Sequence, residues 1–403
     1  MTARGVGQSP MSRGIIVSRM LALAMAPAIG LGIARFAYAL VLPDMRASLA
    51  WSYAEAGWMN TINALGYLLG ALAAGRLTNL MGERRSAIGG TLAAVIAMAL
   101  SGITGNFALL SLARLAAGAG AAIAMVAGGT RASQFANHTP APARTLGVFY
   151  IGPSIGILLS GAIVPGFLAA SGPGAWDSAW LLMAALGAVL LLWFVIGAPL
   201  DEPRTSHGTR RGENAEIRPM LLALTSYFLF GAGYIAYMTF MIAWIREIGG
   251  GVVLESVFWC VIAIAAMAGT TPLSGVVGRM TGGRGLGAMI ALVGIGSGVP
   301  LVIPSTAGLM VSGVVFGMAF FTVVAATTIF VRANYRSEAW ASGIAIMTVS
   351  FSLGQVVGPV AIGVISDATG DLDAGLWLSA ALLLAGAIIG WLQPALAVNR
   401  AER

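Results

Sequence analysis

The sequence predicts an all-α membrane protein whose twelve transmembrane helices form two pseudo-symmetric bundles of six. Three observations lead to this fold class: the composition, the placement of the arginines and an internal repeat. Of 403 residues, 58% are hydrophobic and only 9% are charged, whereas a soluble domain carries roughly 25% charged residues. The mean hydropathy is +0.88. About twelve apolar stretches reach the roughly 20 residues that a helix needs to cross a bilayer.

The arginines alternate between the gaps that separate these stretches. All 22 basic residues are arginines, and 18 of them lie at the chain ends or in every second gap. Only Arg46 and Arg246 lie in the other gaps, while Arg35 and Arg114 lie inside apolar stretches. Because basic residues accumulate in cytoplasmic loops, we expect a multi-pass membrane protein with both termini in the cytoplasm.

The N-terminal half holds six apolar runs, which end where charged residues, Gly or Pro gather. The first run follows Arg19 and is too long for the apolar region of a cleaved signal peptide, so it is interpreted as a membrane helix. The predicted helices of this half are 20–42, 53–78, 86–106, 108–131, 144–169 and 177–199.

A strongly polar segment, 200–218, separates this half from six further apolar runs and is interpreted as a cytoplasmic linker. The predicted helices after it are 219–244, 254–278, 285–303, 306–331, 340–365 and 373–396. The sequence therefore divides into an N-terminal bundle (1–199), the linker (200–218) and a C-terminal bundle (219–403).

The two halves resemble each other at a shift near 200 residues. The segment GRLTNLMGERR begins at Gly75, and GVVGRMTGGRG begins at Gly275. The matching pairs are Gly75 and Gly275, Gly82 and Gly282, Arg84 and Arg284, Glu55 and Glu255, and the Gly-Pro pairs 152–153 and 358–359. A repeat of this size in a helical membrane protein is typical of transporters with two bundles around a central site.

Several classes of protein are disfavoured by the composition. Cys260 is the only cysteine, and His138 and His207 are far apart in sequence, so no metal cluster or intramolecular disulfide is expected. The net charge of +7 is spread over short loops rather than gathered into a nucleic-acid-binding face. The sequence contains no nucleophile-base pair and no phosphate loop. We therefore expect no enzyme activity, no cofactor and no nucleic-acid partner.

The chain resembles the major facilitator superfamily over almost its whole length, and five segments carry the resemblance. GRLTNLMGERR resembles the loop between helices 2 and 3, with Asn79 at the usual Asp position and Glu83 at an expected Arg position. The segment 114–120 resembles the helix 4 motif of proton-linked carriers, and GPSIG (152–156) resembles the helix 5 motif of antiporters, with Val148 in place of a usual Gly. GLGIARFAYALVLPDM (30–45) and EAGWMNTINALGYLLGAL (55–72) are similar to the bacterial YbfB/YjiJ-like subgroup.

The resemblance implies a protein of the bacterial cytoplasmic membrane with a gate on the cytoplasmic side. The residues expected to control the conformational cycle are Gly75, Asn79, Glu83, Arg84, Arg85, Gly152, Pro153, Gly275, Arg284, Gly358 and Pro359. Pro removes a backbone hydrogen bond and clashes with the preceding turn, so both Gly-Pro pairs are expected to bend their helices.

Arg35 and Arg114 are the strongest candidates for substrate binding. Counting 1.5 Å per residue places both roughly 10 Å below the external surface. A charge at that depth is costly and marks a functional site by default. The planar fork of arginine suits a carboxylate or phosphate. The alternatives are snorkelling to the headgroups, or pairing with Asp44 or Glu55.

Polar and aromatic stripes on other helices complete the predicted binding site, although ordinary helix packing explains any single residue equally well. The N-terminal half offers cations and amides, and the C-terminal half offers aromatics. The candidates besides the two arginines are Tyr38, Asn60, Asn63, Tyr67, Tyr234, Tyr237, Phe316, Phe320, Phe351 and Gln355.

The sequence therefore predicts a monomeric secondary transporter for a small organic anion or an amphipathic compound bearing an acid. A proton-coupled efflux antiporter is the alternative. It is weakened because no Asp or Glu lies deep in a predicted helix, where a raised pKa would serve proton coupling. Coupling to a counter-anion stays open, and so does a membrane sensor that does not transport.

Overall fold

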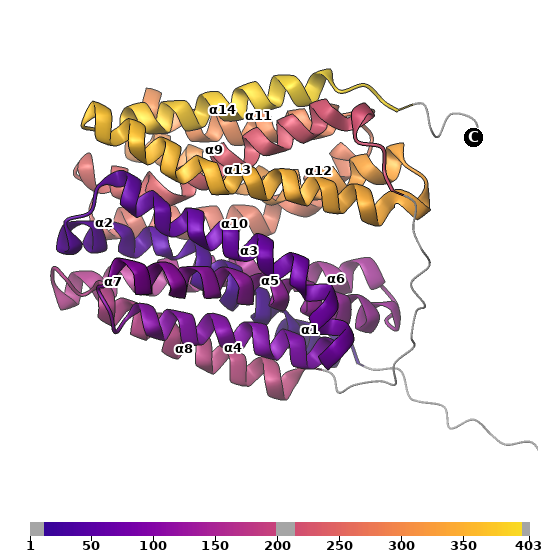
Figure 1. Ribbon diagram of the computed structural model, residues 1–403, viewed down its shortest axis with the longest axis horizontal. Coiled ribbons are helices and arrows are strands. Elements are labelled where there is room, and N and C mark those ends of the chain that lie inside the picture. The colour runs from indigo at the N-terminus through magenta and orange to yellow at the C-terminus, as the bar shows by residue number, and fades with distance from the viewer. Residues whose placement is uncertain (1–11, 199–213, 397–403) are drawn as a thin grey trace, which may run out of the picture.

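The computed structural model describes residues 12–198 and 214–396, and over these residues the chain is helical, with no strand. The N-terminal half occupies one side of the molecule and the C-terminal half the other (Figure 1). The first half consists of α1 (Arg13–Pro27), the π-helix η1 (Ala28–Phe36), α2 (Tyr38–Leu49), α3 (Tyr53–Met81), α4 (Glu83–Ser101), α5 (Phe107–Asn137), α6 (Pro142–Tyr150), α7 (Gly152–Ser171) and α8 (Trp176–Gly197).

The second half contains six long helices and two short 3-10 turns. They are η2 (Arg218–Met220), α9 (Leu221–Glu247), α10 (Val252–Val277), α11 (Arg284–Val302), α12 (Thr306–Asn334), η3 (Ser337–Ala339), α13 (Trp340–Thr369) and α14 (Asp373–Leu392). The predicted linker 200–218 lies for the most part outside the described residues, as do His207 and Arg403.

Each half packs its helices in the same order, as the sequence repeat predicts. In the first half α3 and α4 pack on α5, and α8 packs on α1 and α4. In the second half α10 and α11 pack on α12, and α14 packs on α9 and α11. Across the halves α3 packs on α13, and α7 packs on α10. In this packing order α3 corresponds to α10, and α7 corresponds to α13. Interchanging the halves therefore converts each of these two contacts into the other, which confirms the predicted pseudo-symmetric fold.

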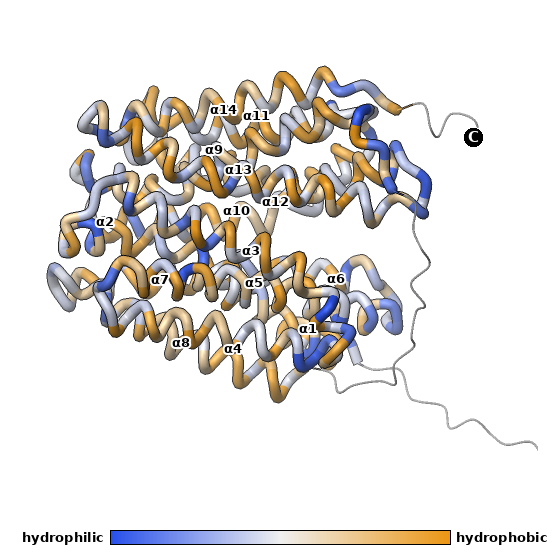
Figure 2. The backbone as a smooth tube through the Cα atoms, viewed as in Figure 1, coloured by the Kyte–Doolittle hydropathy of each residue, from blue (hydrophilic) through white to orange (hydrophobic). Residues whose placement is uncertain are grey.

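Ten described helical segments are long and apolar enough to cross a membrane. The two predicted spans outside this set are α3 and α4, which have 29 and 19 residues and are therefore long enough as well. Their composition is more polar: α3 carries Asn60, Thr61 and Asn63, and α4 begins with Glu83 and two arginines. Polar segments lie mainly at the two ends of the molecule, with an apolar middle (Figure 2).

The first membrane segment departs from the predicted regular helix 20–42. It runs from Arg13 to Leu49 and contains nine residues of π-helix, from Ala28 to Phe36. A π-helix bonds each N–H one residue further back than an α-helix does, so the register of side chains changes within it. This segment carries Arg35, and π-helical turns are frequent at functional sites.

Only one of the two Gly-Pro pairs interrupts its helix. The helix predicted at 144–169 is divided at Ile151 into α6 and α7, directly before Gly152 and Pro153. The helix predicted at 340–365 runs without a break through Gly358 and Pro359 as α13.

The helix predicted at 86–106 is shorter in the structure, where it ends at Ser101 as α4. Asn106 instead caps α5, because its side chain accepts hydrogen bonds from the N–H groups of residues 108 and 109.

Candidate functional site

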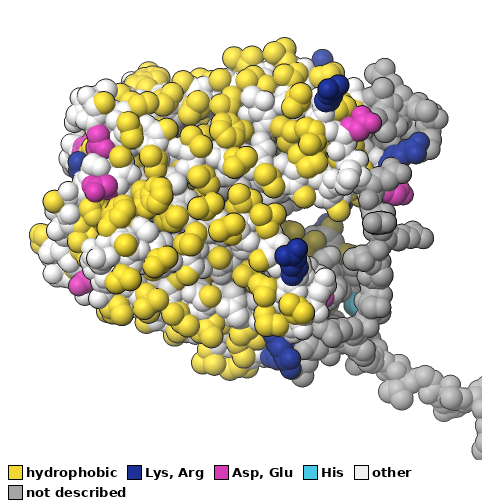
Figure 3. All heavy atoms as spheres, in the orientation of Figure 1, with side chains coloured by type: hydrophobic (Ala, Val, Ile, Leu, Met, Phe, Trp, Pro, Cys, Tyr) yellow, Lys and Arg dark blue, Asp and Glu magenta, His cyan; other side chains and the backbone are white. Residues whose placement is uncertain are grey.

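A cavity of about 610 Å³ lies between the two halves. Its walls come from η1, α3, α5, α6 and α7 in the first half and from α9, α10, α12 and α13 in the second. The molecule is hollowed between its halves at the end where α8 stops and η2 begins, which is called the linker end (Figure 3). The space is of the size that small-molecule sites usually have.

Arg35 reaches this cavity from the π-helix. Its side chain is buried, with 3% exposure, and its Nη2 atom has no hydrogen-bond partner among the described residues. The guanidinium lies 5.1 Å from the ring centre of Tyr67 and 5.8 Å from that of Phe36. These rings attract the cation through their faces but accept no strong hydrogen bond from it. Arg35 thus lines the cavity and carries a buried donor that no described residue uses.

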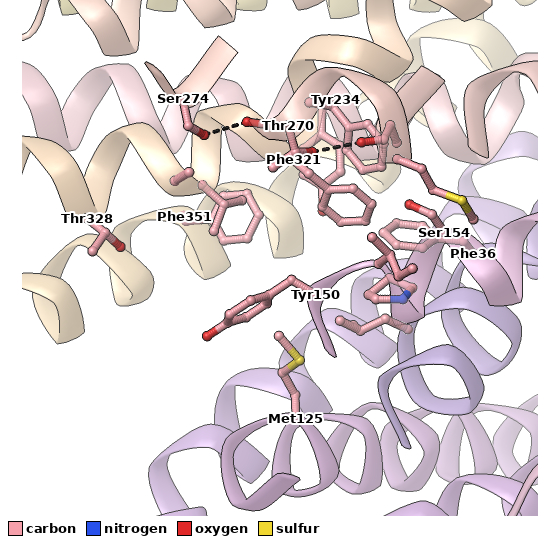
Figure 4. Close-up of a pocket in the computed structure, with 18 of the residues that line it drawn as sticks. Phe36, Met125, Tyr150, Ser154, Tyr234, Thr270, Ser274, Phe321, Thr328 and Phe351 are labelled. Carbon is pink, nitrogen blue, oxygen red and sulfur yellow. Dashed lines mark hydrogen bonds between the residues drawn. The ribbon is translucent and has the colours of Figure 1, made fainter. Parts of the chain in front are cut away.

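The second half lines the cavity with four nearly parallel aromatic rings, those of Phe230, Tyr234, Phe320 and Phe351. Phe230 stacks on Tyr234 at 4.8 Å with 13° between the planes, and Tyr234 stacks on Phe351 at 5.6 Å with 10°. Tyr234 also stacks on Phe320 at 6.3 Å, and Phe36 meets Phe320 edge to face at 6.3 Å. All five rings line the cavity, and three of them are labelled in Figure 4. Flat, apolar walls of this kind pack well against a ring.

Gln355, on α13, supplies a second polar atom without a partner. The side chain is fully buried, and its Nε2 donates to the hydroxyl of Tyr234 at 2.5 Å while its Oε1 has no partner among the described residues. Two other hydroxyls on the wall are already engaged. Thr270 and Ser274 donate to carbonyls one turn back on α10, at 2.8 and 2.6 Å (Figure 4).

The part of the cavity wall that the structure describes carries no negative side chain. None of its residues is Asp or Glu, and Arg35 is the only arginine among them. Within the described part of the chain, no three His, Cys, Asp or Glu residues stand close enough to hold a metal ion. The site is therefore a cationic, aromatic pocket with two buried polar atoms that have no hydrogen-bond partner among the described residues.

Arg114 is buried to the same extent as Arg35, but it does not line the cavity. Its guanidinium donates to the carbonyls of Ala34 and Met59 at 2.5 and 3.3 Å, and to Oδ1 of Asn60 at 3.0 Å. It also lies 4.8 Å from the ring centre of Tyr38. Its donors thus join the end of the π-helix, through Ala34, to α3, through Met59 and Asn60.

The remaining sequence-predicted binding residues fall into two groups. Tyr67, Tyr234, Phe320, Phe351 and Gln355 join Arg35 at the cavity. Tyr38, Asn60, Asn63, Tyr237 and Phe316 do not line it. Asn63 donates to the Arg114 carbonyl at 2.9 Å, and Tyr237 bonds to Ser312 at 2.5 Å.

Several cavity residues were not among the predicted candidates. Phe36 and Phe230 belong to the aromatic wall, and Tyr150, Ser154 and Phe321 lie beside it (Figure 4). Phe36 directly follows Arg35, and Phe230 shares a helix face with Tyr234, so both could have been inferred from the sequence. Nothing in the sequence pattern separated Thr270 or Ser274 from other small residues of α10.

At the end away from the linker the halves are joined tightly. Asp367 on α13 accepts hydrogen bonds from the first two N–H groups of α3, those of Tyr53 and Ala54, at 2.7 and 2.9 Å. The Tyr53 hydroxyl donates to Glu247 at the end of α9. A side chain at Gly57 would place its Cβ 2.3 Å from the carbonyl oxygen of Pro359, so only glycine allows this approach of α3 and α13.

The predicted gating glycines lie free at the linker end. A Cβ at Gly75 or at Gly275 would meet no atom within 4 Å. Arg84 donates to the Val195 carbonyl at 3.1 Å, and Glu83 accepts from Gln134 at 3.5 Å. Asn79, Arg85 and Arg284 are exposed. Gly152 and Gly358, by contrast, lie against Ala24 and Ala232 in close helix crossings.

Two repeated helical bundles around a cavity that opens at one end define a membrane transporter. The chain belongs to the major facilitator superfamily, in the family described as "Uncharacterised MFS-type transporter YbfB", which matches residues 27–390. It is 26% identical over 228 residues to an "Uncharacterized MFS-type transporter YceJ" of Bacillus subtilis (strain 168), and the match spans 53% of this chain and 55% of that relative.

Solved structures with the same fold are transporters as well. The nucleoside transporter NupG superposes with a TM-score of 0.71 at 13% identity, covering 94% of this chain and 98% of that one. A bacterial homologue of the human lysosomal transporter Spinster, in an inward-facing and occupied conformation, gives a TM-score of 0.71 at 15% identity, covering 95% and 97%. At these identities the likeness establishes the fold alone.

Proposed function

We propose that this transporter moves a small organic anion with an apolar, ring-bearing body by alternating access. The observation that carries this proposal is the Nη2 atom of Arg35, which is buried at the cavity without a partner among the described residues. A buried charge without a partner is costly. An anionic group on the cargo would supply the missing acceptor, and the arginine fork suits a carboxylate or phosphate.

The surroundings of Arg35 support an anion over a cation. No described residue on the cavity wall is acidic, so nothing there would compensate a positive cargo. The aromatic wall supports a cargo with an apolar body, because rings bury large area at low cost in conformational entropy.

Alternating access is supported by the contrast between the two ends. The end away from the linker is joined by Asp367 and by the glycine contact at Gly57, whereas Gly75 and Gly275 stand free at the linker end. Rocking one half against the other would separate the contacts at Asp367 and Gly57. The same motion would bring Gly75 and Gly275 to the interface between the halves. With the arginine-rich end in the cytoplasm, this is an inward-facing state.

The orientation has its own test. A cytoplasmic reporter fused after Arg403 should be active, because basic residues are retained on the cytoplasmic side. An external signal from that fusion would reverse the assignment of the two ends.

Ligand binding tests the substrate class. Purified protein would be screened by thermal shift against organic acids, matched neutral amides and nucleosides, since a bound ligand raises the melting temperature. Acids should bind, and Arg35→Lys should weaken them about ten- to a hundredfold, as expected for losing a charged hydrogen bond. Arg218→Lys is the matched control, because Arg218 is exposed and does not line the cavity.

Transport itself is tested in liposomes with the best-binding acid. Uptake should be saturable and should fall in the Arg35→Lys protein. Stimulation by a proton gradient would identify proton coupling, and stimulation by a second internal anion would identify exchange. Tighter binding of nucleosides or of cationic compounds than of any acid would refute the anion proposal.

A further inference from the structure

We propose that the cargo also carries a hydroxyl group on its ring body, and that Gln355 and Tyr234 recognise this hydroxyl by hydrogen bonding. The inference rests on the proposed function, because it adds a second recognition element to the same cavity. It makes Gln355 a specificity-determining residue and narrows the substrate class to hydroxylated ring acids.

The first step in the argument is the unpartnered amide oxygen. Gln355 is fully buried and lines the cavity, and its Oε1 accepts no hydrogen bond within the described chain. Buried side-chain polar atoms are paired in the large majority of cases, and an orphan among them calls for an explanation. When the halves close around a cargo and expel water, the cargo must provide the donor.

The second step is the chemistry of the neighbouring tyrosine. The Tyr234 hydroxyl accepts the hydrogen bond from Nε2 of Gln355 at 2.5 Å, which leaves its own proton free to be donated. The pair therefore offers one acceptor and one donor side by side. A hydroxyl group is both a donor and an acceptor, so it matches this pair more fully than an ether or a carbonyl does.

The third step is the wall that joins the two polar points. From Arg35 the wall continues through the neighbouring Phe36 to Phe320 and then to Tyr234, with ring centres 6.3 Å apart at each step. Phe230 and Phe351 extend the stack in nearly parallel planes. A planar cargo lying on this wall would hold its acid at Arg35, in the first half, and its hydroxyl at Gln355, in the second. It would thereby bind both halves at once.

The discriminating ligands are sets of acids that differ only at the hydroxyl. Suitable probes are benzoate with its meta- and para-hydroxy and methoxy derivatives, and naphthoate with the corresponding derivatives. The hydroxy acid that fits should bind about tenfold more tightly than both its parent acid and its methyl ether. The methyl ether keeps the acceptor oxygen and removes the donor, so it isolates the bond to Oε1.

Two variants assign this preference to the amide. Gln355→Met keeps a similar volume without the acceptor, so it should reduce the hydroxy acid to the affinity of its parent and leave the parent unchanged. Tyr234→Phe removes the neighbouring hydroxyl but keeps Oε1. It should therefore retain most of the preference for the hydroxy acid over the methyl ether.

The outcomes separate this inference from the proposed function. If no acid binds the wild-type protein, the proposed function itself fails. If acids bind and depend on Arg35 but show no hydroxyl preference, the inference is wrong and the anion proposal stands. Tighter binding of the methyl ether, or an equal loss of every acid in Gln355→Met, would also overturn it.

Discussion

Two arginines of equal burial have different surroundings in this protein. Arg35 and Arg114 are 3% and 2% exposed. Nη2 of Arg35 has no partner among the described residues, whereas Arg114 donates to the carbonyls of Ala34 and Met59 and to Asn60. The sequence identified both as charges inside apolar helices and could not separate them. Arg35 lies in the π-helix, which packs against α5 and α7, whereas Arg114 lies on α5 and donates to a carbonyl near the end of that π-helix.

The two arginines should therefore respond in opposite ways to the same substitution. Arg35→Met removes a charge that has a buried donor without a described partner, so the melting temperature should be unchanged or raised while acid binding is lost. Arg114→Met leaves several carbonyls without donors and should lower the free energy of unfolding by about 3 kcal/mol. Thermal denaturation in detergent and acid binding, measured on both proteins, check this contrast.

A fall in melting temperature for Arg35→Met that equals the fall for Arg114→Met would contradict this distinction. It would mean that Arg35 has a structural partner outside the described contacts. Loss of binding in Arg114→Met at temperatures where that protein is folded would instead support a direct role for Arg114 in the site.

At the level of elements, the sequence predicted the helices well where apolar runs meet charged ends. It also located the interruption at Gly152 and Pro153, because proline cannot continue the hydrogen-bond ladder. It did not predict the π-helix at Ala28–Phe36, since its composition, AIGLGIARF, is that of an ordinary apolar helix. Close approach explains why α3 has glycine at positions 57, 66 and 70, each facing backbone of α5 or α13.

Two glycines of α3 allow a matched test of the closed and open ends. Gly57→Ala would place a Cβ 2.3 Å from a backbone oxygen of Pro359, so it should oppose closure of the end away from the linker. Gly75→Ala meets nothing within 4 Å and should leave that closure intact. Both changes add the same roughly 1 kcal/mol of helix propensity, so this effect cancels in the comparison.

Spin-label distances can report both ends of the molecule. In a Cys260→Ser background, labels at the exposed residues Ala47 and Ala368 follow the end away from the linker. Labels at Leu80 and Arg279 follow the linker end. The Ala47–Ala368 distance should lengthen in Gly57→Ala alone. Equal behaviour of the two glycine variants would refute the role of the Gly57 contact.

A bulkier residue at Gly75 tests the gating role expected from the sequence. In the proposed cycle this position comes to the interface only when the linker end closes. Gly75→Leu should therefore slow transport while leaving acid binding to the inward-facing state largely intact. Unchanged transport in this variant would remove Gly75 from the gate.

For the molecule as a whole, the repeat and the arginine pattern predicted two bundles, and the helix packing agrees with that symmetry. The composition of the cavity was predictable in part. Its cation, Arg35, comes from the first half and most of its aromatic wall from the second, but the amide that lines it, Gln355, also comes from the second half. The sequence could not show which stripes face the cavity, since Asn60 and Tyr237 satisfy the same spacing rules as Tyr67 and Tyr234 but bond to Thr239 and Ser312 instead. Those choices depend on the rotation of each helix.

The carboxylate of Asp367 should set the balance between the two states of the molecule. It lies in the second half and accepts hydrogen bonds from the first two N–H groups of α3, in the first half. A helix N-terminus favours a negative charge, and a cap of this kind contributes about 1 kcal/mol. This contribution exists only while the end away from the linker is closed. Asp367→Ala removes both acceptor oxygens and should thus shift the population about fivefold toward the state open at that end. The shift should be larger when Tyr53→Phe also removes the bond to Glu247.

The Ala47–Ala368 label distance measures the shift, and Asp371→Ala is the control because Asp371 makes no contact with the other half among the described bonds. An unchanged distance distribution in the double variant would mean that the glycine contacts, rather than these polar bonds, hold that end closed.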